Sequence, residues 1–440
     1  MRSQRWVVFG VGSIVYVWLL SRSWVGRDQI ILLNLGEEFV RTGTLSPVAK
    51  SMSGGGMIPG SLLQVLIGLP LSIWHDYRAP LIPIAIFTML GGLVLYKTMD
   101  TVIGPRFAFL YFALYWLSPW LLYHTAVLWE PAYLLLPSAL HFWACAKSRQ
   151  NPSFFPSVVL GAILLLTPQI HGSFLFLWIL TALLVYKKII RIHWIGALTG
   201  ALIGMLTLIP MLQAALTTGM PSSLPTEGFI GKGFLYVWPV LKGMLYWVRL
   251  PSLDIGVALK EIVYFNSGWA EGSVLKIILL IILRIMQGIS TLTIAYVLFA
   301  YYRLNKVRLE SKKQFNEDNS TEAIATAQTA GFDWLKKYVW YSFWALAASA
   351  GFAPVVMQEW HVIIALHAAI IPFAIFVFTK PPRWKKGPNL IVAYILFGVL
   401  LTVIIGLGKP TFRKDALPKE VTEMPITRSL FPADMPIEPN

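Results

Sequence analysis

Two carboxylates near apolar segments could carry chemistry at a membrane surface. Asp28 lies in GRDQIILLNLGEEFVRTG (residues 26–43), directly after a very apolar N-terminal segment. Glu130 lies directly before Pro131. A carboxylate at such a place can act as a general base that takes the proton from an attacking hydroxyl group. Each also has a structural alternative, because Asp28 could cap the helix that follows it, and Glu130 could cap a helix with proline at its first position.

The place of Asp28 in its helix favours the catalytic interpretation. One face of a helix over residues 28–41 is apolar, and its members are Ile31, Leu32, Leu35 and Phe39. Asp28 falls within this stripe and not among the polar residues of the opposite face. A carboxylate that is partly shielded from water is a stronger base. We therefore expect Asp28 to be partly buried and to act as a base.

A phosphate that departs during a reaction needs positive charge nearby, because its negative charge grows in the transition state. The most informative cation is Arg284. It precedes an apolar span, 285–302, that is long enough to cross a membrane by itself, so Arg284 is expected at the outer rim, at the depth of a lipid phosphate. The alternative is that Arg284 only reaches toward lipid head groups. Other candidates for binding substrate or phosphate are His124, His171, Lys242, Arg249 and His361.

The composition indicates an all-α polytopic membrane protein. Of the 440 residues, 56% are hydrophobic and 13% are charged, and the mean hydropathy is +0.65, which is typical of membrane proteins and not of soluble domains. The single cysteine, Cys145, excludes a disulfide framework and a cysteine-based zinc site. The net charge of +15 is distributed between apolar spans and not over a folded basic domain, so nucleic acid is not expected as a partner.

Eleven segments are apolar over a length that can cross a membrane. They are residues 6–20, 80–99, 105–121, 131–146, 154–170, 172–186, 193–216, 285–302, 338–357, 361–379 and 389–408. Residues 59–74 form a twelfth apolar segment, and the positive-inside rule decides whether it crosses the membrane. If it does not cross, the clusters of lysine and arginine all fall on the cytoplasmic side together with Arg2 and Arg5; if it crosses, three of them move outside. We therefore expect eleven transmembrane helices and a cytoplasmic N-terminus.

This topology assigns the loops to the two sides of the membrane. Residues 21–79 form the first external loop, with surface helices at 28–41 and 59–74. The other external segments are 122–130, the turn at His171, the segment 217–272 and the tail 409–440. The cytoplasmic segment 304–336 is polar and is expected to be mobile. For His171, which follows Gln169 at a turn, the alternative to substrate binding is a histidine whose hydrogen bonds are satisfied within the interface.

The order and sidedness of four segments resemble the GT-C superfamily of membrane glycosyltransferases, which includes the protein O-mannosyltransferases (glycosyltransferase family 39) and the lipid A aminoarabinose transferases. The resemblance consists of an acidic residue after the first span, a surface helix that ends the first loop, a second external loop with an acidic residue, and a Q-x-H turn. The segments are GRDQIILLNLGEEFVRTGTLSP, GGGMIPGSLLQVLIGLPLSIW, SPWLLYHTAVLWEPAYLLL and LLTPQIHGSFLFLWIL. The match covers residues 1–216, and each motif alone is loose.

The resemblance implies an enzyme that transfers a sugar, with inversion, from a polyprenyl-phosphate carrier to an acceptor outside the cytoplasm. It implies an integral protein of the bacterial inner membrane whose active site faces the periplasm or exterior, with residues 1–216 as the catalytic module and further helices in 273–408. It also implies that Asp28 is the base. Two positions depart from the family pattern: Gln29 stands where the family often has Glu, and Glu130 stands where it often has Asp with a basic neighbour. The sequence leaves the sugar open, and the acceptor could be a lipid, a glycan or a protein.

The segment 217–272 is interpreted as a lid over the groove for donor and acceptor. It contains GFLYVWPVLKGMLYWVRLPS, in which aromatic residues alternate with Lys242 and Arg249. Aromatic rings stack on sugars, and lysine or arginine holds phosphate, although aromatic residues also gather at any membrane interface. Asp28 and Glu130 could also share a divalent cation such as Mg²⁺ or Mn²⁺, but two carboxylates alone do not define a metal site.

Two other functions compete with this one. A transporter or lipid flippase predicts charged residues in the middle of the spans, and here the charges lie at the ends of spans and in loops. A lipid-linked glycan polymerase or ligase uses a similar donor but depends on arginine and histidine in a large external loop. Loss of activity on Asp28→Asn favours the transferase, whereas loss only at Arg249 or His361 favours the polymerase.

Overall fold

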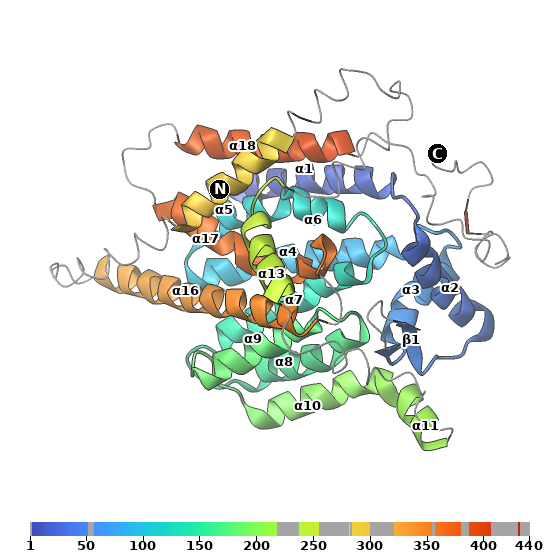
Figure 1. Cartoon of the computed structure of the whole chain (residues 1–440). Helices are drawn as coiled ribbons and strands as arrows, with labels where there is room; N and C mark the ends of the chain where they lie inside the picture. The colour runs from blue at the N-terminus through green and yellow to red at the C-terminus, as the bar shows by residue number, and fades with distance from the viewer. Residues whose placement is uncertain are drawn as a thin grey trace.

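The protein is described from a computed structural model. The structure describes residues 2–51, 57–217, 237–254, 281, 284–299, 321–353, 357–379, 387–405 and 430–431. Most of these residues are helical, as expected, and Figure 1 shows long helices packed side by side. The long elements are α1 (Arg2–Leu20), α4 (Leu81–Val102), α5 (Pro105–Trp116), α7 (Leu135–Lys147), α8 (Phe154–Leu166), α9 (Phe174–Tyr186), α10 (Trp194–Met205), α11 (Ile209–Thr217), a helix over Arg284–Phe299, α16 (Thr321–Gly351), α17 (Leu366–Thr379) and α18 (Gly387–Ile405).

Over its described residues, each of the eleven apolar segments coincides with helical structure, but several of them are divided into shorter helices and turns. The segment 105–121 is divided into α5 and the short helix α6 (Pro119–His124). Ser118 has an extended backbone, with φ −64° and ψ 128°, as the proline that follows it requires. Before α7, the chain forms the 3-10 turn η1 (Glu130–Leu134), with Pro131 in its first turn.

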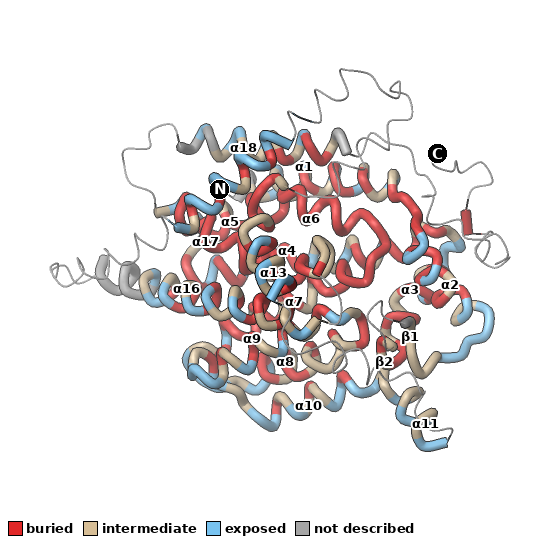
Figure 2. Tube along the Cα trace, viewed as in Figure 1, coloured by how far each residue is buried: buried red, intermediate tan, exposed pale blue. Residues whose placement is uncertain are grey.

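Among the described residues, three helical segments are long and apolar enough to cross a membrane. They are α4, the segment Trp194–Thr217 made of α10, the turn η3 (Leu206–Leu208) and α11, and the segment Glu359–Thr379 made of the 3-10 turn η5 (Glu359–Ala365) and α17. In Glu359–Thr379, 89% of the most apolar stretch of 18 residues is buried inside the protein, whereas in Trp194–Thr217 the share is 17%. Figure 2 shows the same contrast between α17 and α10. Consequently α17 lies in the core of the bundle and α10 at its periphery, where lipid would cover it.

Glycines on α10 allow this peripheral helix to approach α8 very closely. Gly196, Gly200 and Gly204 recur every fourth residue and so share one face of α10. A Cβ atom at Gly200 would overlap with the carbonyl oxygen of Val158, and one at Gly161 of α8 would overlap with the carbonyl oxygen of Ala197. The two backbones are therefore in contact, and no larger residue fits between them.

Replacing Gly200 by leucine should lower the free energy of unfolding by about 3 kcal/mol or more, because the added side chain meets backbone atoms that cannot move aside without separating α8 from α10. Thermal unfolding of the purified protein in detergent measures the effect. Thr199→Leu places the same leucine side chain at a half-exposed position of the same helix and should change stability much less. Equal melting temperatures for the two variants would contradict the packing described here.

Residues 21–79, the expected first loop, contain two helices where the sequence predicts them. They are α2 (Arg27–Thr42), which ends at Gly43 with φ 65°, and α3 (Leu62–Ile73). Gly36 of α2 lies directly against Gly68 of α3. Between the helices lies an antiparallel hairpin of β1 (Val48–Ser51) and β2 (Met57–Pro59), which was not predicted because SPVAKSMSGGGMIPG reads as a loop. Figure 1 shows these elements together at the end of the bundle away from the start of α1.

Gln169 joins this loop to the bundle. Its Nε2 donates to the carbonyl of Gly204 over 2.9 Å, and its Oε1 accepts from the Thr207 hydroxyl over 2.7 Å. The backbone N–H of Ser61, at the start of α3, donates in turn to the carbonyl of Thr207 over 3.1 Å. The glutamine of the Q-x-H turn therefore has a structural role, because it fixes the junction on which the first loop rests.

A buried polar network fixes the junction between η5 and α17. His367 Nδ1 lies 3.0 Å from the carbonyl oxygen of Ile364, which can only accept, so Nδ1 carries the proton. Tyr338 Oη then donates to His367 Nε2 over 3.0 Å, and Tyr111 Oη donates to the carbonyl of His367 over 2.8 Å. These bonds hold the end of η5, which also carries His361.

Three predicted segments are only partly described. The last part of the segment 304–336, which was expected to be mobile, is helical, because α16 begins at Thr321 in TEAIATAQTA, a sequence of high helix propensity. Residues 304–320 lie outside the described residues. Within the expected lid 217–272, the structure describes α13 (Val237–Arg249) and the turn that follows it to residue 254. Within 409–440 it describes residues 430–431, which contact Tyr77.

Candidate active site

Asp28 lies in the first turn of α2 and does not cap it. The cap residue is Gly26, whose N–H donates to Gln29 Oε1 over 2.9 Å. The amide Nε2 of Gln29 donates to the carbonyl of Leu128 in the second loop over 3.1 Å. Gln29, which departs from the family pattern, therefore performs the capping and ties the two loops together. Asp28 has no hydrogen bond to any described residue, so its carboxylate is available to a substrate.

The prediction that Asp28 lies in the apolar stripe and is partly buried is wrong, because Asp28 and Ile31 are both exposed. The buried face of α2 is centred on Leu33 and Gly36, where the glycine allows contact with α3. This contact rotates the buried face away from the stripe that hydrophobicity alone suggests. The result places the Asp28 carboxylate at the surface of the protein, at the end of the bundle that carries the first loop.

Lys50 pairs with Glu130 and was missed by the sequence analysis. Its Nζ is 2.5 Å from Glu130 Oε1, and the two side chains are only 14% and 7% exposed. Burial would lower the pKa of Lys50, but the Glu130 carboxylate and, more weakly, Asp28 outweigh it and raise this pKa. The ammonium group of β1 therefore brings the first-loop acid and the second-loop acid into one electrostatic cluster.

His171 and His361 stand next to each other beside this cluster. Their ring centroids are 5.3 Å apart. Ser173 joins them, because its hydroxyl donates to the carbonyl of His361 over 2.7 Å and lies 2.8 Å from His171 Nδ1. Burial, reinforced by the positive charge of Lys50, lowers the pKa of His171 to about 3. His171 is therefore a neutral hydrogen-bonding group at physiological pH and not a cation.

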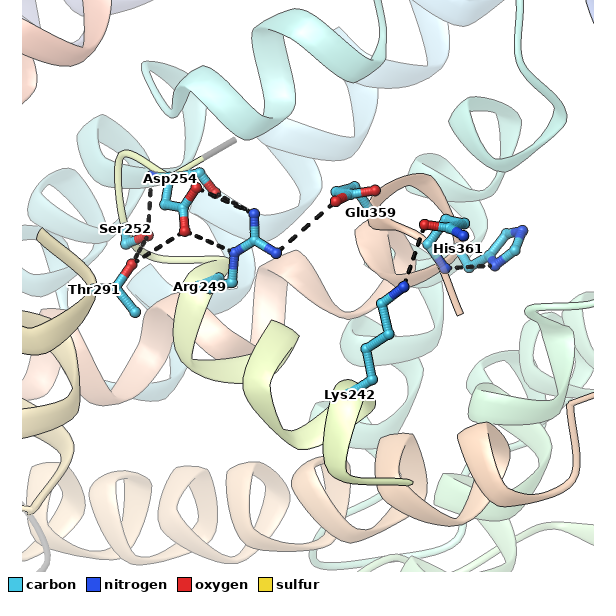
Figure 3. Close-up of polar contacts among 8 residues, drawn as sticks. Lys242, Arg249, Ser252, Asp254, Thr291, Glu359 and His361 are labelled. Carbon is cyan, nitrogen blue, oxygen red and sulfur yellow. Dashed lines mark hydrogen bonds and ion pairs between the residues drawn. The ribbon is translucent and has the colours of Figure 1, made fainter. Parts of the chain in front are cut away.

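Lys242 and Arg249 of α13 point toward η5 (Figure 3), where they have different partners. Arg249 Nε lies 2.9 Å from Asp254 Oδ2, and its Nη1 lies 3.9 Å from Glu359 Oε1, so two carboxylates neutralise it. Lys242 Nζ donates to the neutral side chain of Gln358 over 3.3 Å. Of these two cations, Lys242 is therefore the one whose charge is left for a substrate.

His124 lies behind the cluster and is buried, with 2% of its surface exposed. Its ring lies near those of Trp120, 5.3 Å away, and Trp129, 5.8 Å away. Burial, together with the positive charge of Arg249, lowers the pKa of His124 to about 3. In this structure His124 supports the second loop from inside and does not reach a substrate surface.

Arg284 is exposed at the start of the helix Arg284–Phe299. The helix is attached to the turn after α13, because Ser290 Oγ accepts from the backbone N–H of Leu253 over 2.9 Å. No described contact brings Arg284 to Lys50 or Glu130. Of the predicted residues, Glu130 pairs with Lys50, and Asp28 and His171 lie within range of its charge. His361 stands next to His171 and within range of the charge of Lys242. Arg249 pairs with Asp254 and Glu359, His124 is buried, and no described contact links Arg284 to these residues.

A metal between the two acids would have to compete with Lys50. Nowhere in the described part of the chain do three or more histidine, cysteine, aspartate or glutamate side chains form a group that could hold a metal ion. Glu130 is already bound to an ammonium group. As described, the cluster is suited to binding an anion next to a carboxylate, and Mg²⁺ or Mn²⁺ would have to displace the lysine.

Solved structures of similar fold come from one protein. The chain is similar to ArnT from Cupriavidus metallidurans bound to undecaprenyl phosphate, with a TM-score of 0.52 and 11% identity over 96% of this chain and 73% of that one. It is also similar to the same protein in the apo state, with a TM-score of 0.50 and 14% identity over 89% and 64% of the two chains. No protein-family model matches the chain, and no curated protein matches its sequence. The likeness therefore concerns the fold.

Proposed function

We propose that this protein is a GT-C membrane glycosyltransferase that moves a sugar from a polyprenyl-phosphate donor to an acceptor on the extracytoplasmic side of the membrane. The motif order in residues 1–216 and the ArnT-like fold support the same superfamily from independent directions. The ArnT structure bound to undecaprenyl phosphate supports the class of donor. The observation on which the proposal rests is that Lys50 pairs with Glu130 and lies within range of the charge of Asp28, so that acids from two separate loops act on one ammonium group.

In the proposed reaction, the acceptor hydroxyl attacks the anomeric carbon from the side opposite the phosphate. Asp28, whose carboxylate is exposed and free of hydrogen bonds to described residues, takes the hydroxyl proton as the new carbon–oxygen bond forms. The bond between the anomeric carbon and the phosphate oxygen breaks, and the phosphate leaves with the electron pair. Attack and departure on opposite sides invert the configuration. Glu130 does not take the proton in this scheme, because it holds Lys50 in place.

The growing charge on the departing phosphate is stabilised by Lys50 and Lys242, with His361 as a further hydrogen-bond donor. The Nδ1 atom of His361 accepts the backbone N–H of Gln358 over 3.0 Å, so a neutral ring carries its proton on Nε2. Arg249 acts differently, because its ion pairs with Asp254 and Glu359 tie α13 to η5. We do not assign Arg284 a role in this step.

In the membrane, we propose eleven spans with a cytoplasmic N-terminus, so that the end of the bundle with α2, α3 and the hairpin faces the periplasm or exterior of a bacterial inner membrane. The polyprenyl tail then needs an apolar path beside the site. A small apolar hollow next to the Arg249–Asp254 pair holds little more than one water molecule and would have to widen to take the chain. It is lined by Leu117, Pro119, Leu253, Phe373, Tyr394 and Ile395, among others.

The competing functions fit the described residues less well. A transporter predicts charges at mid-depth, but the segment Trp194–Thr217 has no charged residue, and Glu359–Thr379 has one, at its first position. A glycan polymerase or ligase predicts that Arg249 binds the donor phosphate, but two carboxylates already neutralise it. An exposed carboxylate, Asp28, near the ammonium group of Lys50 is better suited to a base-assisted transfer.

The proposal is tested by lipid binding to the full-length protein in nanodiscs. Undecaprenyl phosphate should bind roughly 10–100 times more tightly than undecaprenol, which has the same chain without the charge, because a hydrogen bond to a charged group contributes about 1.5–3 kcal/mol. Native mass spectrometry measures both affinities. Equal affinities would contradict a phosphate site, and with it the proposed donor class.

A further inference from the structure

Four aromatic rings from three segments form a stack next to Glu130, which belongs to the electrostatic cluster with Lys50 and Asp28. Trp120 and His124 are 5.3 Å apart with an interplanar angle of 30°, and His124 and Trp129 are 5.8 Å apart at 25°. Trp129 and Trp360 of η5 follow at 5.1 Å and 32°. Trp24 closes the side of the stack, since its ring meets Trp129 edge-on at 5.5 Å and 84°. The rings are therefore held by one another and cannot turn independently.

Trp360 is the end of this stack and its only partly exposed ring. Trp120, His124 and Trp129 have 0%, 2% and 7% of their surface exposed, whereas Trp360 is of intermediate exposure. Among the described residues, the other ring next to Trp360 is that of His361, which meets it nearly edge-on, at 75° and 5.5 Å. One face of the Trp360 indole is thus supported by Trp129, and no described ring stacks on the other.

The open ring lies among the groups that the reaction uses. Its supporting residue, Trp129, directly precedes Glu130, which binds Lys50. Its neighbour His361 lies within range of the charges of Glu130 and Lys242. Its other neighbour, Glu359, pairs with Arg249 of α13. A molecule stacked on Trp360 would therefore be next to the ammonium groups proposed to hold the phosphate.

We infer that Trp360 is the platform on which the pyranose ring of the lipid-linked sugar stacks, an inference that rests on the proposed function. The flat face of an indole suits the carbon–hydrogen face of a pyranose, which is apolar, while the sugar hydroxyl groups at the ring edge remain free for polar partners. The stack behind Trp360 fixes the ring before the sugar arrives, so little conformational entropy is lost on binding. Trp360 thereby determines the orientation of the sugar and not the affinity for its carrier.

The inference is tested by measuring how two kinds of lipid, with and without a sugar, bind to the full-length protein in nanodiscs. The probes are undecaprenyl phosphate and undecaprenyl phosphates that carry one pyranose each. Trp360→Ala should weaken binding of the glycosylated lipid that the wild type prefers about tenfold and leave binding of bare undecaprenyl phosphate unchanged. Trp360→Phe should retain most of the affinity, whereas Trp360→Leu, which keeps apolar bulk without a ring, should behave as alanine does. Trp194→Ala, at a strongly exposed tryptophan of α10, is the control.

The outcomes separate this inference from the proposed function. A wild-type protein that binds neither lipid contradicts the proposed function. A wild-type protein that binds all of them equally leaves the donor class intact but overturns the sugar platform. Equal weakening of bare and glycosylated lipid by Trp360→Ala also overturns it, since the ring would then contact the prenyl chain or support the fold. Full activity and affinity in Trp360→Leu would overturn it as well.

Discussion

Replacing Asp28 by asparagine should lower the turnover number for sugar transfer by about 10²–10⁴-fold, the usual contribution of a general base. Asparagine keeps the shape of the side chain but cannot take the proton of the acceptor hydroxyl. Because Asp28 contributes no cap bond to α2, which Gln29 and Gly26 close, the fold should not change. The affinity for undecaprenyl phosphate should be maintained or rise, since a negative charge near the phosphate is removed.

The measurement is single-turnover transfer from the lipid-linked sugar at saturating donor, with binding measured in parallel. Glu38→Gln is the matched control, because Glu38 is another exposed carboxylate on the same helix. It should leave turnover unchanged. If Asp28→Asn turns over at the wild-type rate, a different group takes the proton. If both variants lose activity to the same extent, the effect belongs to the surface charge of α2 and not to a base.

Replacing Lys50 by glutamine should have the second large effect, on stability and on binding together. The change leaves Glu130 buried without its cation, and removal of one partner from a buried ion pair typically costs about 3–5 kcal/mol. With only 14% and 7% of the two side chains exposed, the pair is largely shielded from water. The affinity for undecaprenyl phosphate should fall as well, because the Lys50 ammonium group uses only one of its three donors on Glu130 and the variant loses the other two.

A double variant separates the two effects. Lys50→Gln combined with Glu130→Gln removes both charges, so most of the melting temperature should return while the affinity for the lipid phosphate stays low. Thermal unfolding and native mass spectrometry are measured on the wild type, the two single variants and the double variant. This double-mutant cycle gives the coupling energy between Lys50 and Glu130. Additive losses in stability would mean that the pair is not coupled. Recovery of phosphate affinity in the double variant would mean that Lys50 serves only to neutralise Glu130.

The sequence was sufficient to predict the helical architecture and the two surface helices of the first loop, because long apolar segments and the order of the loops determine these features. It also indicated Asp28, Glu130, His171 and His361, four residues from different segments that the structure places at one end of the bundle. It failed on the orientation of α2, because hydrophobicity does not show that Gly36 permits contact with α3 and thus sets the buried face.

Residues that act through long-range contacts could not be predicted. Lys50 lies in a stretch rich in serine and glycine, and only the hairpin brings it to Glu130, 80 residues away in the sequence. Trp360 resembles any tryptophan at a membrane interface until the stack behind it is known. Arg249 looked like a phosphate ligand because Asp254 and Glu359, which neutralise it, are five and 110 residues away.

The hydrogen bond between Gln29 and the carbonyl of Leu128 has a consequence for how ligands enter and leave the site. It fastens the segment that carries the proton acceptor to the segment that carries Glu130, and the short ion pair with Lys50 fastens both to the hairpin. That wall is rigid as a unit. The opposite wall is held by longer contacts, 3.3 Å from Lys242 to Gln358 and 3.9 Å from Arg249 to Glu359. If the proposed lipid-linked donor binds here, we therefore expect it to enter, and the spent carrier to leave, on the side of α13, where the contacts are longer.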